Sequence, residues 1–304
     1  MDNGSAAPLR SGRLPGMTAE RPRPVLRPGL RLARRCDGHL QAGLSPALRS
    51  GLPDTPLGRR LARALHQLDA DPPEGADGLL VRLAGLLVDG RELARTLEEH
   101  PDQGPEVAAA YHRHGAAARS RWRHRADVRV QVTGPEGWRE VASSLLARQG
   151  IGLVPSDRPG DLRLLLHVGE PSAALADPLL RAGMPHLWAG TSAGEVGLGP
   201  FVDPGRTPCR RCVVADLSGR DPGHALLREQ YVDPVGDVPE PVDPALMTMA
   251  VAWAVRDVVT WVDGSVPSSW GATIQLPVEG APREQRHRRQ PECGCSWTQG
   301  WRAG

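Results

Sequence analysis

Two closely spaced cysteine pairs are the residues best suited to chemistry in this sequence. Cys209 and Cys212 form a C-x-x-C pair, and Cys293 and Cys295 form a C-x-C pair much further along the chain. Four thiolates in two close pairs supply the tetrahedral sulfur set that zinc prefers, and a filled set leaves no open position for catalysis. We therefore predict one structural zinc ion. The alternative is a pair of disulfides or unrelated buried thiols, and Cys36 is left over as an ordinary thiol.

The basic residues set a second chemical constraint. All 37 are arginine, because lysine occurs at no position. A Walker-A loop needs a lysine on the phosphates, and Schiff-base chemistry needs a lysine amine. The sequence excludes both, together with any mechanism in which an ammonium group holds a triphosphate.

A reduced glycine loop lies at the start of the second half of the chain. Nucleotide loops use glycines so that backbone amides reach phosphate, beside a helix N-terminus. Only Gly134 and Gly137 remain here, Pro135 removes one amide donor, and Glu136 places negative charge where phosphate would lie. Asp157 follows about twenty residues later, where Rossmann units carry a ribose-binding carboxylate, although a plain loop aspartate is the alternative. We interpret Gly134, Gly137 and Asp157 as a vestigial nucleotide site and do not expect ATP to bind.

The elements that position these residues indicate an α/β domain over residues 127–304. Alternating valines predict a strand at 128–132, followed by a glycine turn, an amphipathic helix and a second strand at 151–154. This order begins a right-handed parallel βαβ unit. A nearly continuous apolar run at 162–168 is typical of a buried parallel strand. Asp243 is expected to cap a long apolar helix, and we predict a doubly wound, Rossmann-like sheet.

A smaller unit over residues 25–97 precedes this domain. Alternating apolar residues around Asp37 and Gly38 predict a hairpin over residues 30–44, because Asp-Gly is a strong hairpin-turn signal. A helix is expected to follow Asp54 or Thr55 as its cap, with Pro56 at its first position. Its apolar stripe consists of Leu57, Leu61, Leu65 and Leu68.

The remaining segments lack a periodic apolar face. Residues 1–24 are polar and rich in proline, glycine and arginine, so we predict a disordered leader. In residues 98–126, His112, His114 and His124 alternate with arginines, and we predict a linker or an exposed helix with a solvated face.

Charge and hydropathy limit the partners. The net charge of +2 lacks the strong positive field of a general nucleic-acid binder, so nucleic acid is not expected as a partner. No early segment resembles a signal peptide, and the longest apolar run, at 245–255, is too short to span a membrane. We predict a soluble, cytoplasmic protein. In that reducing compartment, paired cysteines are metal ligands more often than disulfides.

The run at 199–212, GPFVDPGRTPCRRC, and the run at 291–295, PECGC, resemble the ThiF-like cyclodehydratase or leader-peptide-binding proteins of azole-modified peptide pathways. The similarity covers residues 25–300. It implies a ThiF-type Rossmann domain joined to a small, winged-helix-like α+β peptide clamp over residues 25–97. It also implies a homodimer that binds a precursor leader peptide, or another peptide or protein partner, for a separate catalytic subunit.

The sequence departs from the adenylating members of that family. Those members use a glycine-rich loop, an arginine and a lysine after the second strand, and an aspartate on magnesium. Here the loop is reduced, lysine is absent, and the stretch from Val154 to Asp161 is too short for a further strand and helix. The resemblance therefore implies a non-catalytic scaffold without catalytic residues. The alternatives are a divergent ATP-dependent adenylyltransferase that uses arginine on phosphate, and a winged-helix DNA-binding protein.

The same resemblance suggests how a peptide would bind. A small hairpin exposes an edge of unpaired amides, to which an extended peptide adds as a further strand. We expect the helix stripe of Leu57, Leu61 and Leu65 to offer an apolar wall for its side chains. The alternative is that these leucines only fill the core of the small domain.

Overall fold

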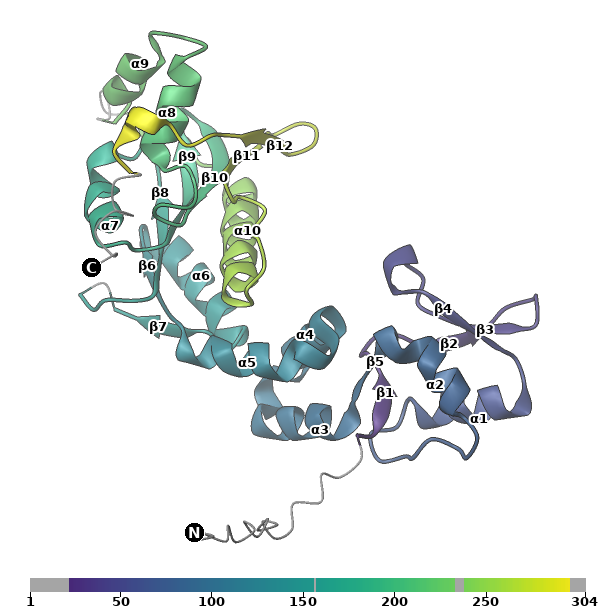
Figure 1. The fold of residues 1–304 in the computed structure, drawn as a ribbon. Coiled ribbons are helices and arrows are strands. Elements are labelled where there is room, and N and C mark those ends of the chain that lie inside the picture. The colour runs from purple at the N-terminus through teal and green to yellow at the C-terminus, as the bar shows by residue number, and fades with distance from the viewer. Residues whose placement is uncertain (1–21, 156, 233–237, 296–304) are drawn as a thin grey trace, which may run out of the picture. The chain divides into compact units, whose positions relative to one another are not determined.

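The computed structural model describes residues 22–155, 157–232 and 238–295. The chain forms two compact units, Met1–Arg95 and Thr96–Gly304 (Figure 1). Most of the predicted disordered leader lies outside the described residues.

The first unit contains a three-stranded antiparallel sheet in the order β2-β3-β4. The predicted hairpin is confirmed, because β2 and β3 pair around the turn at Asp37 and Gly38. Gly38 has a φ of 77°, which favours glycine at this position. The strands are β2 (Leu32–Arg34), β3 (His39–Ala42) and β4 (Ser50–Pro53).

Helices cover one face of this sheet and complete its core. Of the two predicted caps, Thr55 is the one used: its hydroxyl accepts a hydrogen bond from the Gly58 amide at 3.1 Å, and Pro56 is at the first helical position. The helix ends at Ala64, so Leu65 and Leu68 of the predicted stripe lie beyond it. The other elements are β1 (Pro24–Leu26), η1 (Pro46–Leu48), α1 (Pro56–Ala64), α2 (Asp77–Leu83), η2 (Ala84–Leu86), β5 (Leu87–Asp89) and α3 (Gly90–Glu99).

The second unit is built on a seven-stranded sheet in the order β12-β11-β10-β9-β8-β6-β7, counted over the described residues. The pairs among β6, β7, β8 and β9 are parallel, which confirms the predicted α/β, Rossmann-like class. The antiparallel strands β10, β11 and β12 were not predicted. The strands are β6 (Arg129–Thr133), β7 (Gly152–Val154), β8 (Leu162–His167), β9 (His186–Ser192), β10 (Glu195–Val202), β11 (Ala272–Leu276) and β12 (Arg283–Arg286).

Helices pack on both faces of this sheet, as the doubly wound prediction requires (Figure 1). Leu164 and Leu166 of β8 join the main core with α6 and α10, whereas Leu165 packs on the opposite side with α7. The continuous apolar run of β8 reflects burial on both faces. The helices are α6 (Glu136–Arg148), η5 (Ala173–Leu175), α7 (Asp177–Arg181), α8 (Arg210–Ser218), α9 (His224–Gln230), α10 (Pro244–Val262) and η6 (Pro291–Cys293).

The helix α10 is the central helix of the main core. Asp243 caps it as predicted, since its carboxylate accepts hydrogen bonds from the amides of Ala245 and Leu246 at 2.8 and 2.9 Å. By length and composition alone α10 is apolar enough to cross a membrane, but half of its most apolar window is buried in the protein. Its apolar composition is therefore explained by packing against the sheet and α6.

Of the linker or exposed helix predicted over residues 98–126, the helix is confirmed, but it belongs to the second unit and one of its faces is buried rather than solvated. Trp122 is buried, and the Arg125 guanidinium donates to both carboxylate oxygens of Asp263 at 2.6 and 2.8 Å. His114 contacts the same carboxylate at 2.8 Å. The charged composition of this segment suggested a solvated face. The acid that pairs with Arg125 is Asp263, which follows α10 and is 138 residues away in the sequence, so the pairing could not be seen there. The elements are η3 (Pro101–Gln103), α4 (Gly104–His114), η4 (Gly115–Ala117) and α5 (Ala118–Asp127).

Candidate functional site

The four predicted cysteines converge in the second unit. Cys209 precedes α8 and Cys212 lies in its first turn, while Cys293 ends η6 and Cys295 follows the left-handed Gly294. The sulfur atoms are 3.8 Å apart for Cys209 and Cys212, and 3.4 Å apart for Cys209 and Cys293 and for Cys212 and Cys295. All four lie within 4.8 Å of one another. A tetrahedral zinc site with metal–sulfur bonds of ~2.3 Å needs sulfur–sulfur distances of ~3.8 Å.

The surroundings of the sulfurs also suit a metal centre. Cys209, Cys212 and Cys295 are buried and Cys293 is half-buried. The backbone amide of Gln290 donates to the Cys212 sulfur at 3.4 Å, which orients that ligand. The sulfur separations exceed the disulfide bond length of about 2.05 Å. Among the described residues, these four cysteines are the one group of three or more histidine, cysteine, aspartate or glutamate side chains that could hold a metal ion.

The thiols would not all ionise without a cation. A hydrogen bond with Cys212, together with burial, raises the pKa of Cys209. The same contact lowers the pKa of Cys212 to about 4, and burial raises the pKa of Cys293 to about 11. A thiolate on Cys212 therefore disfavours further thiolates nearby, and a bound divalent cation would supply the missing compensation.

The predicted glycine loop lies between β6 and α6. A side chain at Gly134 would place its Cβ 2.3 Å from the Leu166 carbonyl oxygen, and the Gly134 φ of 131° also favours glycine. Close packing of the loop on β8 is therefore sufficient to explain this glycine. Gly137 lies in the first turn of α6, with nothing within 4 Å of an added Cβ.

Asp157 is exposed on the loop that follows β7. Because β6 and β7 are parallel neighbours, their carboxyl ends meet at the same sheet edge, so Asp157 and the glycine loop lie at that edge. The Gln131 amide donates to the carbonyl oxygens of Pro155 and Arg158, both at 3.1 Å, and this holds the loop. None of the described residues in 155–161 is helical or in a strand, in keeping with the short connection seen in the sequence. That ATP does not bind here stays a prediction.

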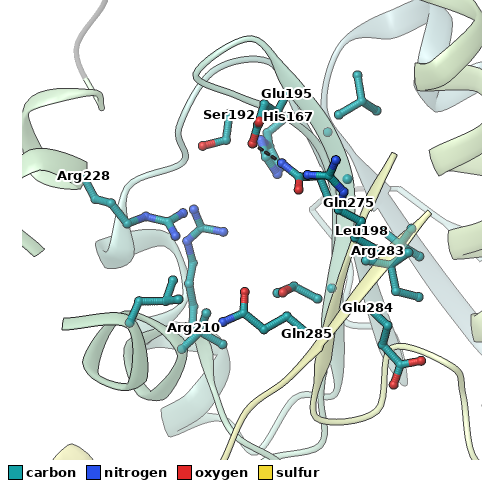
Figure 2. A pocket seen from close by; sticks show the side chains of 18 residues that line it. His167, Ser192, Glu195, Leu198, Arg210, Arg228, Gln275, Arg283, Glu284 and Gln285 are labelled. Atoms are coloured by element: carbon teal, nitrogen blue, oxygen red, sulfur yellow. Dashed lines mark hydrogen bonds between the residues drawn. The ribbon is translucent and has the colours of Figure 1, made fainter. Parts of the chain in front are cut away.

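A pocket of about 500 Å³ was missed by the sequence reasoning. It lies between the sheet and the helices α8 and α9, and Figure 2 shows the side chains that line it. Arg210 and Arg228 reach into it from these helices, and His167 and Ser192 come from the ends of β8 and β9. Burial lowers the pKa of His167 to about 4, so its imidazole is neutral at pH 7.

An ion cluster at the wall of this pocket joins the buried Glu170 to Arg210, which is also buried, and to the partly exposed Arg228. One carboxylate oxygen of Glu170 accepts hydrogen bonds from Arg210 and from Arg228, and the other accepts one from the Ser192 hydroxyl. The Arg210 guanidinium lies over the Trp188 ring, 5.2 Å from its centroid. Burial raises the pKa of Glu170, but Arg210, Ser192 and Arg228 together bring it below its usual value, so this carboxylate is ionised. The sequence signal that could have indicated this cluster was Glu170, an acid that comes three residues after the buried parallel strand β8.

Solved structures share this arrangement of elements. A heterocyclase in complex with substrate and cofactor matches with a TM-score of 0.68 and 19% identity, over 90% of this chain and 39% of that chain. E. coli MccB with AMPCPP and MccA matches with a TM-score of 0.62 and 14% identity, over 90% of this chain and 99% of that chain. The chain has a ThiF-like fold. This confirms the fold that the two cysteine runs implied.

Further matches agree with the ThiF-like fold. The microcin C7 biosynthetic enzyme MccB in complex with N-formylated MccA has a TM-score of 0.60 and 15% identity, over 90% of this chain and 99% of that chain. This chain spans about two fifths of the heterocyclase chain, at 39%. No protein-family model matches the sequence, and no curated protein matches it either.

Proposed function

We propose that this chain is a non-catalytic ThiF-like scaffold that binds a peptide through its first unit and carries a structural zinc ion in its second. The observation that supports peptide binding most directly is the edge of β2, which pairs only with β3 in the part of the chain that the structure describes. The solved structures with this fold include MccB with MccA bound and a heterocyclase with its substrate. We further propose that the protein is a cytoplasmic homodimer that presents a precursor leader peptide to a separate catalytic subunit, in the manner of azole-modified peptide pathways.

The two edges of the small sheet differ. On the β4 side, the Ser50 hydroxyl donates to the Arg82 carbonyl oxygen of α2 at 2.8 Å, so a helix lies beside that strand. On the other side, β2 pairs only with β3 among the described residues. An edge with unpaired amides is a template for a further strand. The β2 edge is therefore the better candidate for peptide addition.

The register of the hairpin identifies the outward amides. The Arg35 amide donates to the His39 carbonyl oxygen at 2.8 Å, so Arg35 forms a hydrogen-bonded pair across the hairpin. Hydrogen-bonded and non-bonded pairs alternate in antiparallel sheets. The amides of Leu32 and Arg34 therefore point away from β3, where an added peptide strand would bond to them.

The expectation that Leu57, Leu61 and Leu65 form an apolar wall for a peptide is wrong for Leu61 and Leu65. Leu61 is fully buried and Leu65 is 1% exposed, so both fill the core of the first unit. Leu57 is only partly buried. The apolar side chains left at the open edge are Leu30 and Leu32, which pack on the core and stay partly exposed. We propose that inward-pointing side chains of the peptide pack on these two leucines.

A proline at an outward-facing position tests the strand model. We expect Arg34→Pro to weaken binding of the precursor peptides encoded beside the gene by at least about tenfold, because it removes an amide donor from the edge while edge strands tolerate proline. Arg34→Ala is the matched control, since it removes the same side chain and keeps the amide. The measurement is a titration of the full-length protein with the peptide, in which the NMR signals of the backbone amides report binding.

Two outcomes would contradict the proposed binding mode. Equal affinities for the proline and alanine variants would show that the β2 edge is not used. Shifts produced only by DNA, with no response to any neighbouring peptide, would favour the DNA-binding alternative.

The absence of adenylation is a separate prediction. With no lysine anywhere and with Pro135 and Glu136 in the loop, a bound triphosphate would meet few compensating groups. We expect no ATP–pyrophosphate exchange above background in the presence of the same peptides. Glu136→Ala, which removes one repulsive charge, should leave this result unchanged because the other deficits persist. Peptide-dependent exchange would favour the adenylyltransferase alternative.

A further inference from the structure

The pocket beside α8 and α9 carries an unbalanced charge at its inner end. Two guanidinium groups, Arg210 and Arg228, share the single carboxylate of Glu170, so these three side chains have a formal charge of +1. The side chains of Arg210 and Glu170 are 8% and 4% exposed, whereas that of Arg228 is 23% exposed, so the surplus charge is only partly solvated. Among the described residues no second acid pairs with these arginines, and a largely buried charge without a counter-ion is unfavourable. An anion in the adjoining cavity would remove this imbalance.

The hydrogen-bonding capacity at this end is also unbalanced. Glu170 already accepts from Arg210, Arg228 and Ser192, so it has little capacity for a further donor. Arg228 uses its Nε and one terminal nitrogen on Glu170, and Arg210 uses one terminal nitrogen. Within the described part of the chain, the remaining guanidinium N–H groups of the pair have no hydrogen-bond acceptor and are available to the cavity that both arginines line. Figure 2 shows the two guanidinium groups side by side at one wall of the pocket.

The opposite wall is close to neutral. Glu195 accepts a hydrogen bond from Gln275, and Glu284 forms an ion pair with Arg286. Arg283 adds one positive charge near Glu195 and Glu284 (Figure 2). The neutral His167 adds none. The surplus positive charge is therefore concentrated at Arg210 and Arg228.

We infer that the inner end of this pocket binds a carboxylate at Arg210 and Arg228. One surplus charge matches a monoanion, and the planar guanidinium fork matches the two oxygens of a carboxylate. The remaining lining combines amide and hydroxyl groups with aliphatic side chains, which suits the backbone of a short peptide next to that carboxylate. The polar lining groups are Thr273, Gln275 and Gln285, and the apolar ones include Leu198, Val213 and Ile274.

This site lies in the second unit and does not depend on strand addition at β2. The carboxylate has two sources in a peptide, the C-terminal carboxyl group and an aspartate or glutamate side chain. Two pairs of probes distinguish them. N-acetyl-triglycine is compared with its C-terminal amide, and N-acetyl-Gly-Glu-Gly-amide is compared with the same peptide carrying glutamine.

Binding of these probes is measured on the full-length protein through amide resonances of residues 190–199. We expect one or both acids to bind and the uncharged partner of each to bind at least about tenfold more weakly, because the amide and glutamine forms lack the charge that Arg210 and Arg228 compensate. Inorganic phosphate serves as a further probe. Equal binding of acid and uncharged partner, or no binding of any acid at millimolar concentration, overturns the inference.

Charge-changing variants separate a binding role from a structural one. Arg228→Gln leaves one arginine on one carboxylate, so we expect at least about tenfold weaker acid binding and an unchanged or higher melting temperature. Arg283→Gln is the matched control and should have a smaller effect, because Arg283 lies at the balanced wall. If Arg228→Gln instead lowers the melting temperature and leaves acid binding unchanged, Arg228 is structural and the inference fails. The inference also fails if phosphate binds more tightly than the carboxylate probes and Arg228→Gln leaves phosphate binding unchanged.

Discussion

Substitution of Cys209→Ser or Cys293→Ser is expected to abolish metal binding and to destabilise the second unit. Three of the four sulfurs are buried, and together they connect the start of α8 to the segment around η6. Structural zinc contributes on the order of 10 kcal/mol in small metal-folded domains. The loss here should be largest around α8 and η6, because the main core of the sheet, α6 and α10 contains none of the four cysteines.

Metal analysis and thermal unfolding test this prediction together. Protein purified without added metal should contain about one zinc ion per chain, and each serine variant should contain none. Cys36→Ser is the matched control, because Cys36 is an exposed thiol of the first unit, and it should leave zinc content and stability unchanged. Detection of Cys209–Cys212 or Cys293–Cys295 disulfides in protein kept reduced would contradict the metal site.

The second large effect is expected at Asp263. Its carboxylate is 1% exposed and pairs with Arg125, whose side chain is 2% exposed, and with His114. Removing one partner of a buried ion pair costs about 3–5 kcal/mol. We therefore expect Asp263→Asn to lower the free energy of unfolding of the second unit by this amount at pH 7. Trp122, which lies under the Arg125 guanidinium at 5.1 Å, provides a fluorescence probe for urea unfolding.

The same side chain predicts a pH dependence. Burial raises the pKa of Asp263, but hydrogen bonds and charge from Arg125 and His114 outweigh this and lower it to about 2. A carboxyl group with a lowered folded-state pKa stabilises the protein above its unfolded pKa, here about 3.9, and loses that contribution as the pH falls to about 2. The stability difference between wild type and Asp263→Asn should therefore shrink over this range.

Asp157→Asn is the control for this comparison, since Asp157 is an exposed acid of the same unit. It should unfold like the wild type at every pH. If the difference in the free energy of unfolding between wild type and Asp263→Asn instead stays constant from pH 7 down to about 2, the ionised Asp263 carboxylate is not the source of that difference.

Local features of the first unit could be predicted from the sequence because they depend on neighbouring residues. The Asp37 and Gly38 turn determines the hairpin, since glycine tolerates the positive φ found there. Thr55 and Pro56 determine where α1 begins. The sequence left open whether Leu61 and Leu65 form a wall for a peptide or fill the core, and the structure shows that they fill the core. That choice, like the end of α1 at Ala64, depends on what packs around the helix.

In the second unit, patterns within single segments identified most of the parallel sheet and the candidate metal ligands. Apolar runs marked β6, β7 and β8, whereas the antiparallel strands β10 to β12 were missed. The two cysteine runs indicated a shared site before any contact between them was known, because sulfur ligands in close pairs have few other uses in a reducing compartment.

Only the tertiary structure decided where the buried charges find their partners. Arg125 and Asp263 are 138 residues apart, and Glu170 is 40 and 58 residues from Arg210 and Arg228. In the sequence these arginines are indistinguishable from solvated ones, since arginine is the only strongly basic residue in the chain. Burial and pairing of a charge depend on which distant elements the sheet brings together. The sequence alone therefore determined the local turns, caps, strands and cysteine pairs, whereas the helical packing of residues 98–126 and the charged pocket required the folded chain.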